Sequence, residues 1–283
     1  MAQKKIQFRK KRETSEIISD TFIFLKQEIK PLAKIVLIYV LPFIILYSIL
    51  QVEIQQKFFD SGIMNDQQTL KNMLLNDPGP FYKNVFIIIL FNVFVQSLFM
   101  AAVYSYIKVY VQKGKGNFSL NEVTSLLFHN SLMVLGAGIV LTLIVAFGLM
   151  MFFVPGIYFA NTLSLTVMIL VFENKGLSHA LTRSWRFVNT HWWNTLLLNI
   201  IGILIILAVG FVISIPTDIA GYSTSVMKIG KQDITDLPKW FWIMTGINAA
   251  ISTLLYIIPY IFLAFQYFNI DERSRAMFPS IRE

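Results

Sequence analysis

Histidine is the first residue type to examine for chemistry, because its side chain titrates near neutral pH without any shift. The chain has three, His129, His179 and His191, and none has a carboxylate partner at the spacing of a metal site. Cysteine is absent, so neither a thiolate nor a disulfide is available. We therefore predict no catalytic residue, no metal and no cofactor, and we interpret the histidines as polar residues of interfacial segments.

Motifs that bind phosphate or activate a nucleophile are also missing. The basic stretch KGKGNFS, Lys113–Ser119, lacks the G-x4-G-K-[ST] order of a P-loop and is interpreted as a flexible loop. No G-x-S-x-G elbow occurs anywhere in the sequence. An enzyme acting on lipids is therefore the least favoured functional hypothesis.

Uncharged polar side chains are the first candidate site, because they lie inside long apolar segments. Asn92 and Gln96 are four residues apart and share a helix face, as do Asn248 and Ser252. An unpaired amide in hydrocarbon is costly, so we expect these groups to face other helices. Two interpretations stay open, namely hydrogen bonds between helices and a polar cavity for a lipid headgroup or another subunit. The candidate polar seam consists of Asn92, Gln96, Asn161, Asn199, Asn248 and Ser252.

Basic residues are the second candidate. A basic run followed by an amphipathic helix is typical of an anchor for anionic lipids, although the same charges also keep an N-terminus in the cytoplasm. No DNA- or RNA-binding motif accompanies the charge, so we expect no nucleic-acid partner. The candidates for contacts with anionic lipid or a partner are Arg9, Lys10, Lys11, Arg12, Arg183 and Arg186.

The elements that must position these residues are membrane spans. Of the 283 residues, 55% are hydrophobic and only 14% are charged, whereas soluble domains carry about 25% charge. We predict an all-α, polytopic integral membrane protein with a single membrane domain, and we see no cleavable signal peptide. The six expected spans cover about 32–51, 84–111, 131–153, 157–173, 193–216 and 240–268, followed by a cytoplasmic tail at 269–283.

The run Leu132–Phe172 contains no charged residue or histidine and is long enough for two crossings of a bilayer. We expect Pro155-Gly156 to form a tight hairpin at the far side of the membrane, because proline interrupts a helix and glycine tolerates turns. The alternative is a kink within one long tilted helix. The small residues Gly136-Ala137-Gly138 and Gly202 are expected to let helices approach closely.

Lysine and arginine set the expected orientation. With the N-terminus placed in the cytoplasm, three-quarters of the 24 Lys and Arg residues fall on inside segments and span ends. The sequence therefore predicts that both termini are cytoplasmic.

Three inside segments are expected to form interfacial helices. Residues 1–31 comprise a basic N-terminus and an amphipathic helix that ends where Pro31 turns the chain into the first span. Ser119 and Glu122 form a capping box that starts a second helix. Ser178 is the expected N-cap of a third, which leads to Trp192-Trp193 at the membrane interface.

A family resemblance rests on the stretch Val154 to Asn194. Its P-G-I-Y segment at 155–158, the Glu at position 173 and the A-L-T-R-S-W segment at 180–185 resemble the signature of the bacterial six-span family named after the glycerophosphodiester phosphodiesterase membrane domain, and of related uncharacterised integral membrane families. The catalytic barrel fused to some members is absent, so the resemblance does not imply their enzymatic activity. It does imply the bacterial inner membrane and partners in a multi-protein complex, linked in some relatives to a MoxR-type ATPase and von Willebrand A proteins.

The leading hypothesis from the sequence is thus a non-catalytic subunit or scaffold of an inner-membrane complex, in contact with membrane lipids and other membrane proteins. The alternative is a carrier or channel for a lipid or another weakly charged molecule, motivated by the candidate polar seam.

Overall fold

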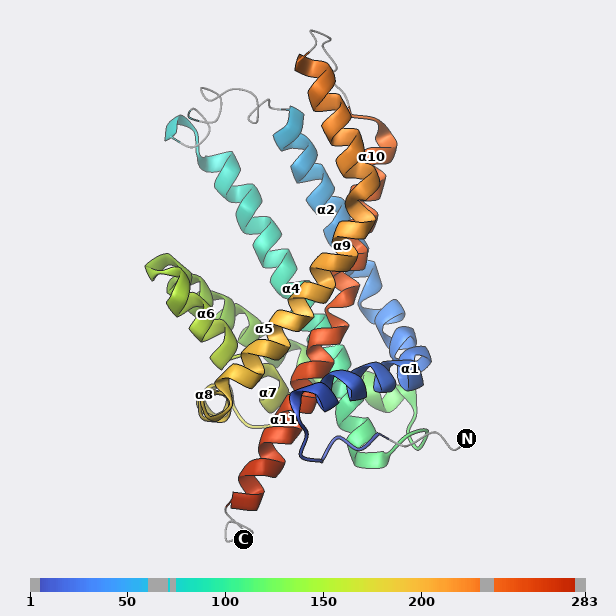
Figure 1. Cartoon of the computed structure of the whole chain (residues 1–283), viewed down its shortest axis with the longest axis vertical. Helices are drawn as coiled ribbons and strands as arrows, with labels where there is room; N and C mark the ends of the chain where they lie inside the picture. Colours follow the sequence, from blue (N-terminus) through green and yellow to red (C-terminus); the bar gives the residue numbers. More distant parts are fainter. Residues whose placement is uncertain (1–5, 61–70, 72–74, 230–236, 278–283) are drawn as a thin grey trace. The chain divides into compact units, whose positions relative to one another are not determined.

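A computed structural model describes residues 6–60, 71, 75–229 and 237–277, and every regular element among them is a helix (Figure 1). In chain order the helices are α1 Thr14–Tyr39, α2 Leu41–Asp60, α4 Gly79–Lys113, α5 Leu120–Met151, α6 Phe153–Thr162, α7 Thr166–Glu173, α8 Leu177–Thr190, α9 Trp192–Ile229, α10 Lys239–Leu255 and α11 Ile257–Met277. Parts of the expected loops, 61–70, 72–74 and 230–236, and the end of the tail, 278–283, lie outside the described residues.

The expected all-α, multi-pass membrane class is confirmed. Within the described residues, five helical segments are long and apolar enough to cross a bilayer, and a sixth is obtained if the bent pair α1–α2 counts as one span. Two of these segments, Phe153–Glu173 and Lys239–Ala276, each consist of two consecutive helices.

The chain divides into two compact units. Unit 1 comprises residues 1–40, 96–204 and 256–283, and unit 2 comprises 41–95 and 205–255. Unit 1 has an aromatic core in which Phe24, Phe99, Tyr104, Phe262, Phe265 and Phe268 are almost fully buried. In unit 2, α2 packs along α10, where Gly246 lies close to Val52.

The expected turn at Pro31 is wrong. Pro31 lies inside α1, which continues as a helix to Tyr39. Proline removes the hydrogen bond that the carbonyl of Gln27 would accept in a regular helix. Here Lys115 Nζ lies 3.4 Å from that carbonyl and donates to it. Because a side chain replaces the missing donor, the helix continues through the proline.

The capping box that starts α5 is confirmed. Ser119 is the N-cap, and Glu122 Oε1 accepts the backbone N–H of Ser119 at 3.3 Å. The hydrogen bond from Lys113 and this N–H lower the pKa of Glu122.

The expected N-cap of α8 is wrong by two residues. Gly176 occupies that position because Asn174, in the left-handed conformation, ends α7 just before it.

The hairpin is present, but its turn lies at Phe152 and not at Pro155-Gly156. Phe152 is extended, with φ −166° and ψ 158°, and separates α5 from α6. Pro155 falls in the first turn of α6, where a missing N–H breaks no helical bond. The return segment is interrupted again at 163–165, so the expected span 157–173 is two short helices.

Gly148 and Gly156 allow α5 and α6 to approach each other closely. A Cβ atom on Gly148 would lie 2.7 Å from Phe159 Cδ2, and one on Gly156 would lie 2.3 Å from Leu149 Cδ2. The expected close approach at Gly202 also occurs, since its Cβ would lie 2.9 Å from the Cβ of Pro259. In the stretch Gly136-Ala137-Gly138 the expectation is wrong at Gly136, where a Cβ meets no atom within 4 Å, whereas Ala137 and Gly138 are buried.

We expect Gly148→Ala to destabilise the α5–α6 hairpin by about 1–3 kcal/mol, the usual cost of overpacking a core. The new methyl group would clash with the Phe159 ring and would lie 3.1 Å from Gly156 Cα. The matched control is Gly136→Ala on the same helix, which should be neutral or stabilising because alanine favours helix. Thermal unfolding in detergent measures both, and equal midpoints for the two variants would contradict the packing described here.

Candidate functional site

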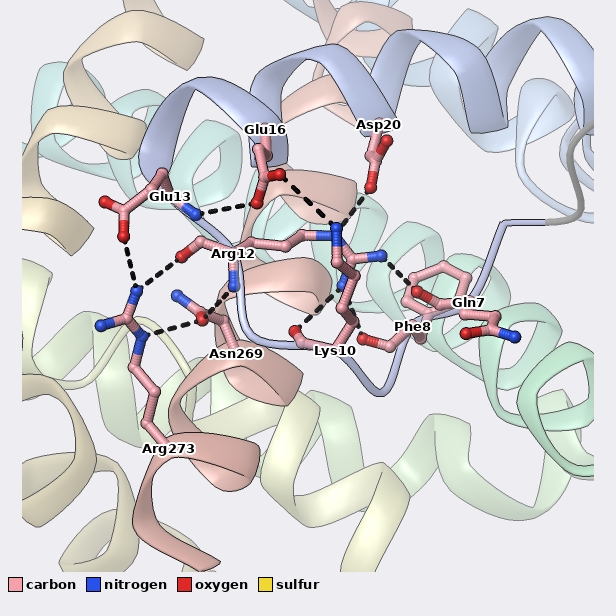
Figure 2. Close-up of polar contacts among 9 residues, drawn as sticks. All are labelled: Gln7, Phe8, Lys10, Arg12, Glu13, Glu16, Asp20, Asn269 and Arg273. Carbon is pink, nitrogen blue, oxygen red and sulfur yellow. Dashed lines mark hydrogen bonds and ion pairs between the residues drawn. The ribbon is translucent and has the colours of Figure 1, made fainter. Parts of the chain in front are cut away.

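The side chain of Arg12 is the most deeply enclosed charge among the described residues of the N-terminal segment, with 1% of its area exposed. Its Nε lies 2.7 Å from Asp20 Oδ2, and its Nη1 donates to the Phe8 carbonyl at 2.8 Å. The guanidinium also lies over the ring of Phe265, 4.7 Å from its centroid. Figure 2 shows Arg12 with Phe8 and Asp20 at α1. Arg12 is therefore fixed to the protein and not presented to lipid.

The backbone next to Arg12 is attached to α11. The Arg12 N–H donates to Asn269 Oδ1 at 2.8 Å, and Arg273 donates to the Arg12 carbonyl at 2.8 Å and pairs with Glu13 (Figure 2). Glu16 accepts the Glu13 N–H in a capping box at the start of α1. That hydrogen bond and the positive charge of Lys10 lower the pKa of Glu16.

Aromatic packing seats the same segment. Phe8 is buried and stacks on Phe265 with 4.3 Å between ring centroids. Edge contacts join Phe8 to Phe24 of α1 and Tyr110 of α4. The N-terminal segment is thus part of the core of unit 1 and not a loose basic arm.

A second group of charges, the Glu173 cluster, joins the end of α7 to α8 and α11. Glu173 pairs with Arg183, accepts the Tyr267 hydroxyl at 3.1 Å and lies 2.9 Å from His179 Nε2. Asp271 receives Arg183 at 3.3 Å. Arg9 and Arg275 complete the cluster, at 3.5 and 2.9 Å from Asp271.

The sequence analysis missed the Glu173 cluster. The absence of a carboxylate at metal-site spacing did not exclude an ordinary contact, because Glu173, six residues earlier, lies 2.9 Å from His179 Nε2. The available signal was positional: Glu173 and Asp271 are the first acidic residues after long apolar runs. At His191, burial and then the nearby charge of Arg273 lower the pKa.

Lys108 provides a third buried polar contact. Its Nζ donates to the Val171 carbonyl at 2.7 Å and to Asn174 Oδ1 at 2.9 Å. Both acceptors lie at the C-terminal end of α7, where a cation is favoured by the helix dipole. Lys108 therefore has a structural role at a helix end.

The candidate polar seam is not one continuous feature in the structure. In unit 1, Asn199 Nδ2 donates to Asn161 Oδ1 at 2.9 Å, and Asn161 donates to the Trp192 carbonyl at 3.1 Å. Gln96 accepts the hydroxyl of Tyr260. The six residues of the candidate polar seam thus belong to separate hydrogen-bonded groups.

In unit 2, Asn92 donates to the Tyr47 hydroxyl at 3.0 Å, so it has a different partner from Gln96 on the same helix. Ser252 donates to Asn248 within α10 at 3.4 Å. The Asn92–Tyr47 bond joins two helices, as one of the two interpretations expects, whereas the Ser252–Asn248 bond does not. None of these four residues lines the groove described below.

The basic candidates separate into two groups. Arg9, Lys10, Arg12 and Arg183 are paired with acidic side chains of the chain itself. Lys11 and Arg186 are exposed, and neither has a hydrogen bond or an ion pair with the described residues. Only these two of the six candidates are fully available to lipid or to a partner.

Unit 2 contains an open apolar groove of about 500 Å³ between α2 and α10. Gly246 widens its floor, and Glu53 and Gln56 lie at one end, where Glu53 pairs with Lys57 at 2.9 Å. The remaining lining is Ile45, Ser48, Ile49, Val52, Trp242, Ile243, Ile247 and Ala250.

Metal chemistry has no candidate in the described part of the chain, where no three His, Asp or Glu side chains are grouped as metal ligands. Comparisons with known proteins add no family: no family model, no curated protein and no solved structure matches this chain.

Arg12→Ala is expected to lower the free energy of unfolding of unit 1 by about 3 kcal/mol, because it leaves Asp20 and buried carbonyls without their donor. The control is Lys11→Ala, which removes an exposed side chain with no partner in the described structure. Limited proteolysis of the N-terminal segment, with thermal unfolding in detergent, measures the difference. Equal protease resistance in both variants would show that Arg12 does not hold the segment.

Proposed function

We propose that this multi-pass membrane protein is a non-catalytic scaffold subunit of a bacterial inner-membrane complex, with both termini in the cytoplasm. The observation that carries the proposal is the placement of α8. Its buried side, Ala180, Ser184 and Val188, faces the body of unit 1, and Arg183 joins it to Glu173 and Asp271. A surface helix is thereby held in a defined position.

The outer side of α8 offers contacts suited to a protein partner. Arg186 and Trp185 are exposed there, and arginine and tryptophan are enriched among the residues that dominate binding energy at interfaces. Trp185 is kept in place by an edge contact with Tyr158, at 5.5 Å between centroids. A pre-positioned aromatic group loses little freedom on binding.

The motif that resembles the glycerophosphodiester phosphodiesterase membrane-domain family supports the same proposal, since it includes part of α6, Glu173 and the middle of α8. Membership of that family, and partners of the MoxR-type ATPase and von Willebrand A kind, belong to this proposal. The excess of lysine and arginine on the expected inside segments supports the orientation.

The test is purification of the tagged chain from native membranes in mild detergent. We expect partner proteins at fixed stoichiometry, and we expect Arg186→Glu to reduce their recovery at least tenfold. The control is Lys239→Glu, an equal charge reversal at an exposed base at the start of α10. A chain that purifies alone, or partners retained by Arg186→Glu, would count against the scaffold function.

The groove of unit 2 favours a second candidate, a carrier for a lipid. Its apolar lining suits an acyl chain. The Glu53–Lys57 pair at its end offers one negative and one positive charge, which suit the two opposite charges of a zwitterionic lipid headgroup. Ala250→Trp should fill the groove and abolish lipid movement in reconstituted vesicles. Leu204→Trp, at an exposed apolar position of α9 outside the groove, should leave it unchanged. Vesicles in which the unaltered chain moves no lipid would eliminate this candidate.

A further inference from the structure

The outer end of the α5–α6 hairpin is entirely apolar and uncovered. Met150, Phe152, Phe153 and Val154 are 84, 76, 71 and 75% exposed. From Leu143 to Ile157 the chain has no polar side chain at all. Exposed apolar patches of this kind identify a surface that meets lipid or another protein and not water.

Other turns of the chain are built differently. Asp77 lies just before α4, Lys83 lies near the start of α4, and α10 begins at Lys239 beside Trp240. Charged, tyrosine and tryptophan side chains are typical of turns that emerge into the headgroup region. The α5–α6 turn has none of them, so its composition is that of a segment surrounded by hydrocarbon.

The contacts of α6 limit how deep this turn can reach. Tyr158 donates to Asn189 of α8 at 3.2 Å and stacks on Trp192, and Ser184 of α8 donates to the Thr162 carbonyl at 2.9 Å. Phe153 is only five residues before Tyr158, which corresponds to about 7.5 Å along a helix. The tip therefore lies within a short distance of α8.

α8 itself belongs at the surface of the membrane. Its exposed Arg186 follows Trp185, the residue in contact with Tyr158, and an exposed arginine is strongly disfavoured at the bilayer centre. A hydrocarbon core is about 30 Å thick. A tip about 7.5 Å beyond the level of Tyr158 does not extend to the opposite headgroups.

We infer that the α5–α6 hairpin is re-entrant: it enters the leaflet on the side of α8, ends among acyl chains and returns without crossing. Its partner is the hydrocarbon of that leaflet, held by Phe147, Met150, Phe152, Phe153 and Val154. The close approach of Gly148 and Gly156 makes the hairpin narrow, which suits insertion between lipid chains. Pro155-Gly156 then lies inside the membrane and not on its far side.

The absence of cysteine makes the inference directly testable by single-cysteine labelling in intact membranes. Gln112→Cys and Gln55→Cys are exposed reporters at the ends of α4 and α2, expected on opposite faces. A membrane-impermeant maleimide should label each of them from one face only. Phe153→Cys should react at least tenfold less from either face, and fully after denaturation in SDS. Reaction of Phe153→Cys from the Gln55 face or from the Gln112 face would overturn the inference.

Depth measurement separates a re-entrant hairpin from a crossing one even where both resist labelling. Nitroxides placed at Phe153→Cys and Leu143→Cys occupy exposed positions at the tip and on α5. In a re-entrant hairpin the tip is the deepest point, so the ratio of oxygen to nickel-complex accessibility should be higher at Phe153. In a crossing hairpin Leu143 lies nearer the bilayer centre, and the reverse order would overturn the inference.

Discussion

Hydrocarbon provides no water to replace a lost hydrogen bond, so a backbone carbonyl left free by its own helix needs a donor from elsewhere in the protein. Pro31 interrupts the bonding of α1, and Lys115 donates to the carbonyl that it frees. Lys108 donates to the Val171 carbonyl at the open end of α7. In both places a flexible cationic side chain supplies the donor that the backbone lacks. The exposed carbonyl of Gln27 and the buried carbonyl of Val171 thus each have a donor from a lysine side chain.

The ion pairs of unit 1 fix the positions of the N-terminal segment and of α8 more than they add to the net free energy of unfolding. Burying a charge pair carries a desolvation cost that can equal its attraction, whereas removing one partner is strongly destabilising. Arg12 offsets that cost with bonds to carbonyls and a contact with the Phe265 ring, in addition to Asp20. The result is a single arrangement of the N-terminal segment against α1 and α11. The Glu173 cluster does the same for α8 through Arg183.

Local signals in the sequence predicted local structure well. The capping box of Ser119 and Glu122 requires only neighbouring residues, and the structure contains it. Apolar runs also predicted the membrane class, because lipid acts on every residue of a span in the same way. The basic run at 9–12 predicts contacts with anionic lipid or a partner, yet the Arg12 side chain is buried against Asp20 and Phe265, and its backbone N–H donates to Asn269, 257 residues away. The spacing of residue types along the sequence does not predict a contact between residues so far apart.

The errors at the two prolines have a shared cause. A proline predicts a break only if nothing replaces the hydrogen bond it removes, and that depends on what packs beside it. Lys115 replaces the donor at Pro31, and at Pro155 the first turn of α6 needs none. Break positions are therefore a property of tertiary contacts, which a single sequence does not display, whereas the number of apolar segments is a property of composition.

The placement of α8 connects the two surfaces for which we propose partners. Its residues Ser184, Trp185 and Asn189 contact α6, the return arm of the hairpin, through Thr162 and Tyr158. Its Arg183 reaches Glu173 and Asp271. α8 is thus held between an apolar element and a charged cluster, as an amphipathic helix at an interface requires. A force applied by a partner to α8 would act on α6 directly, since no flexible segment lies between their contacting side chains. The surface proposed for a partner and the hairpin proposed to face lipid are accordingly parts of one packed structure, through the contacts of α8 with α6 and with Glu173 and Asp271.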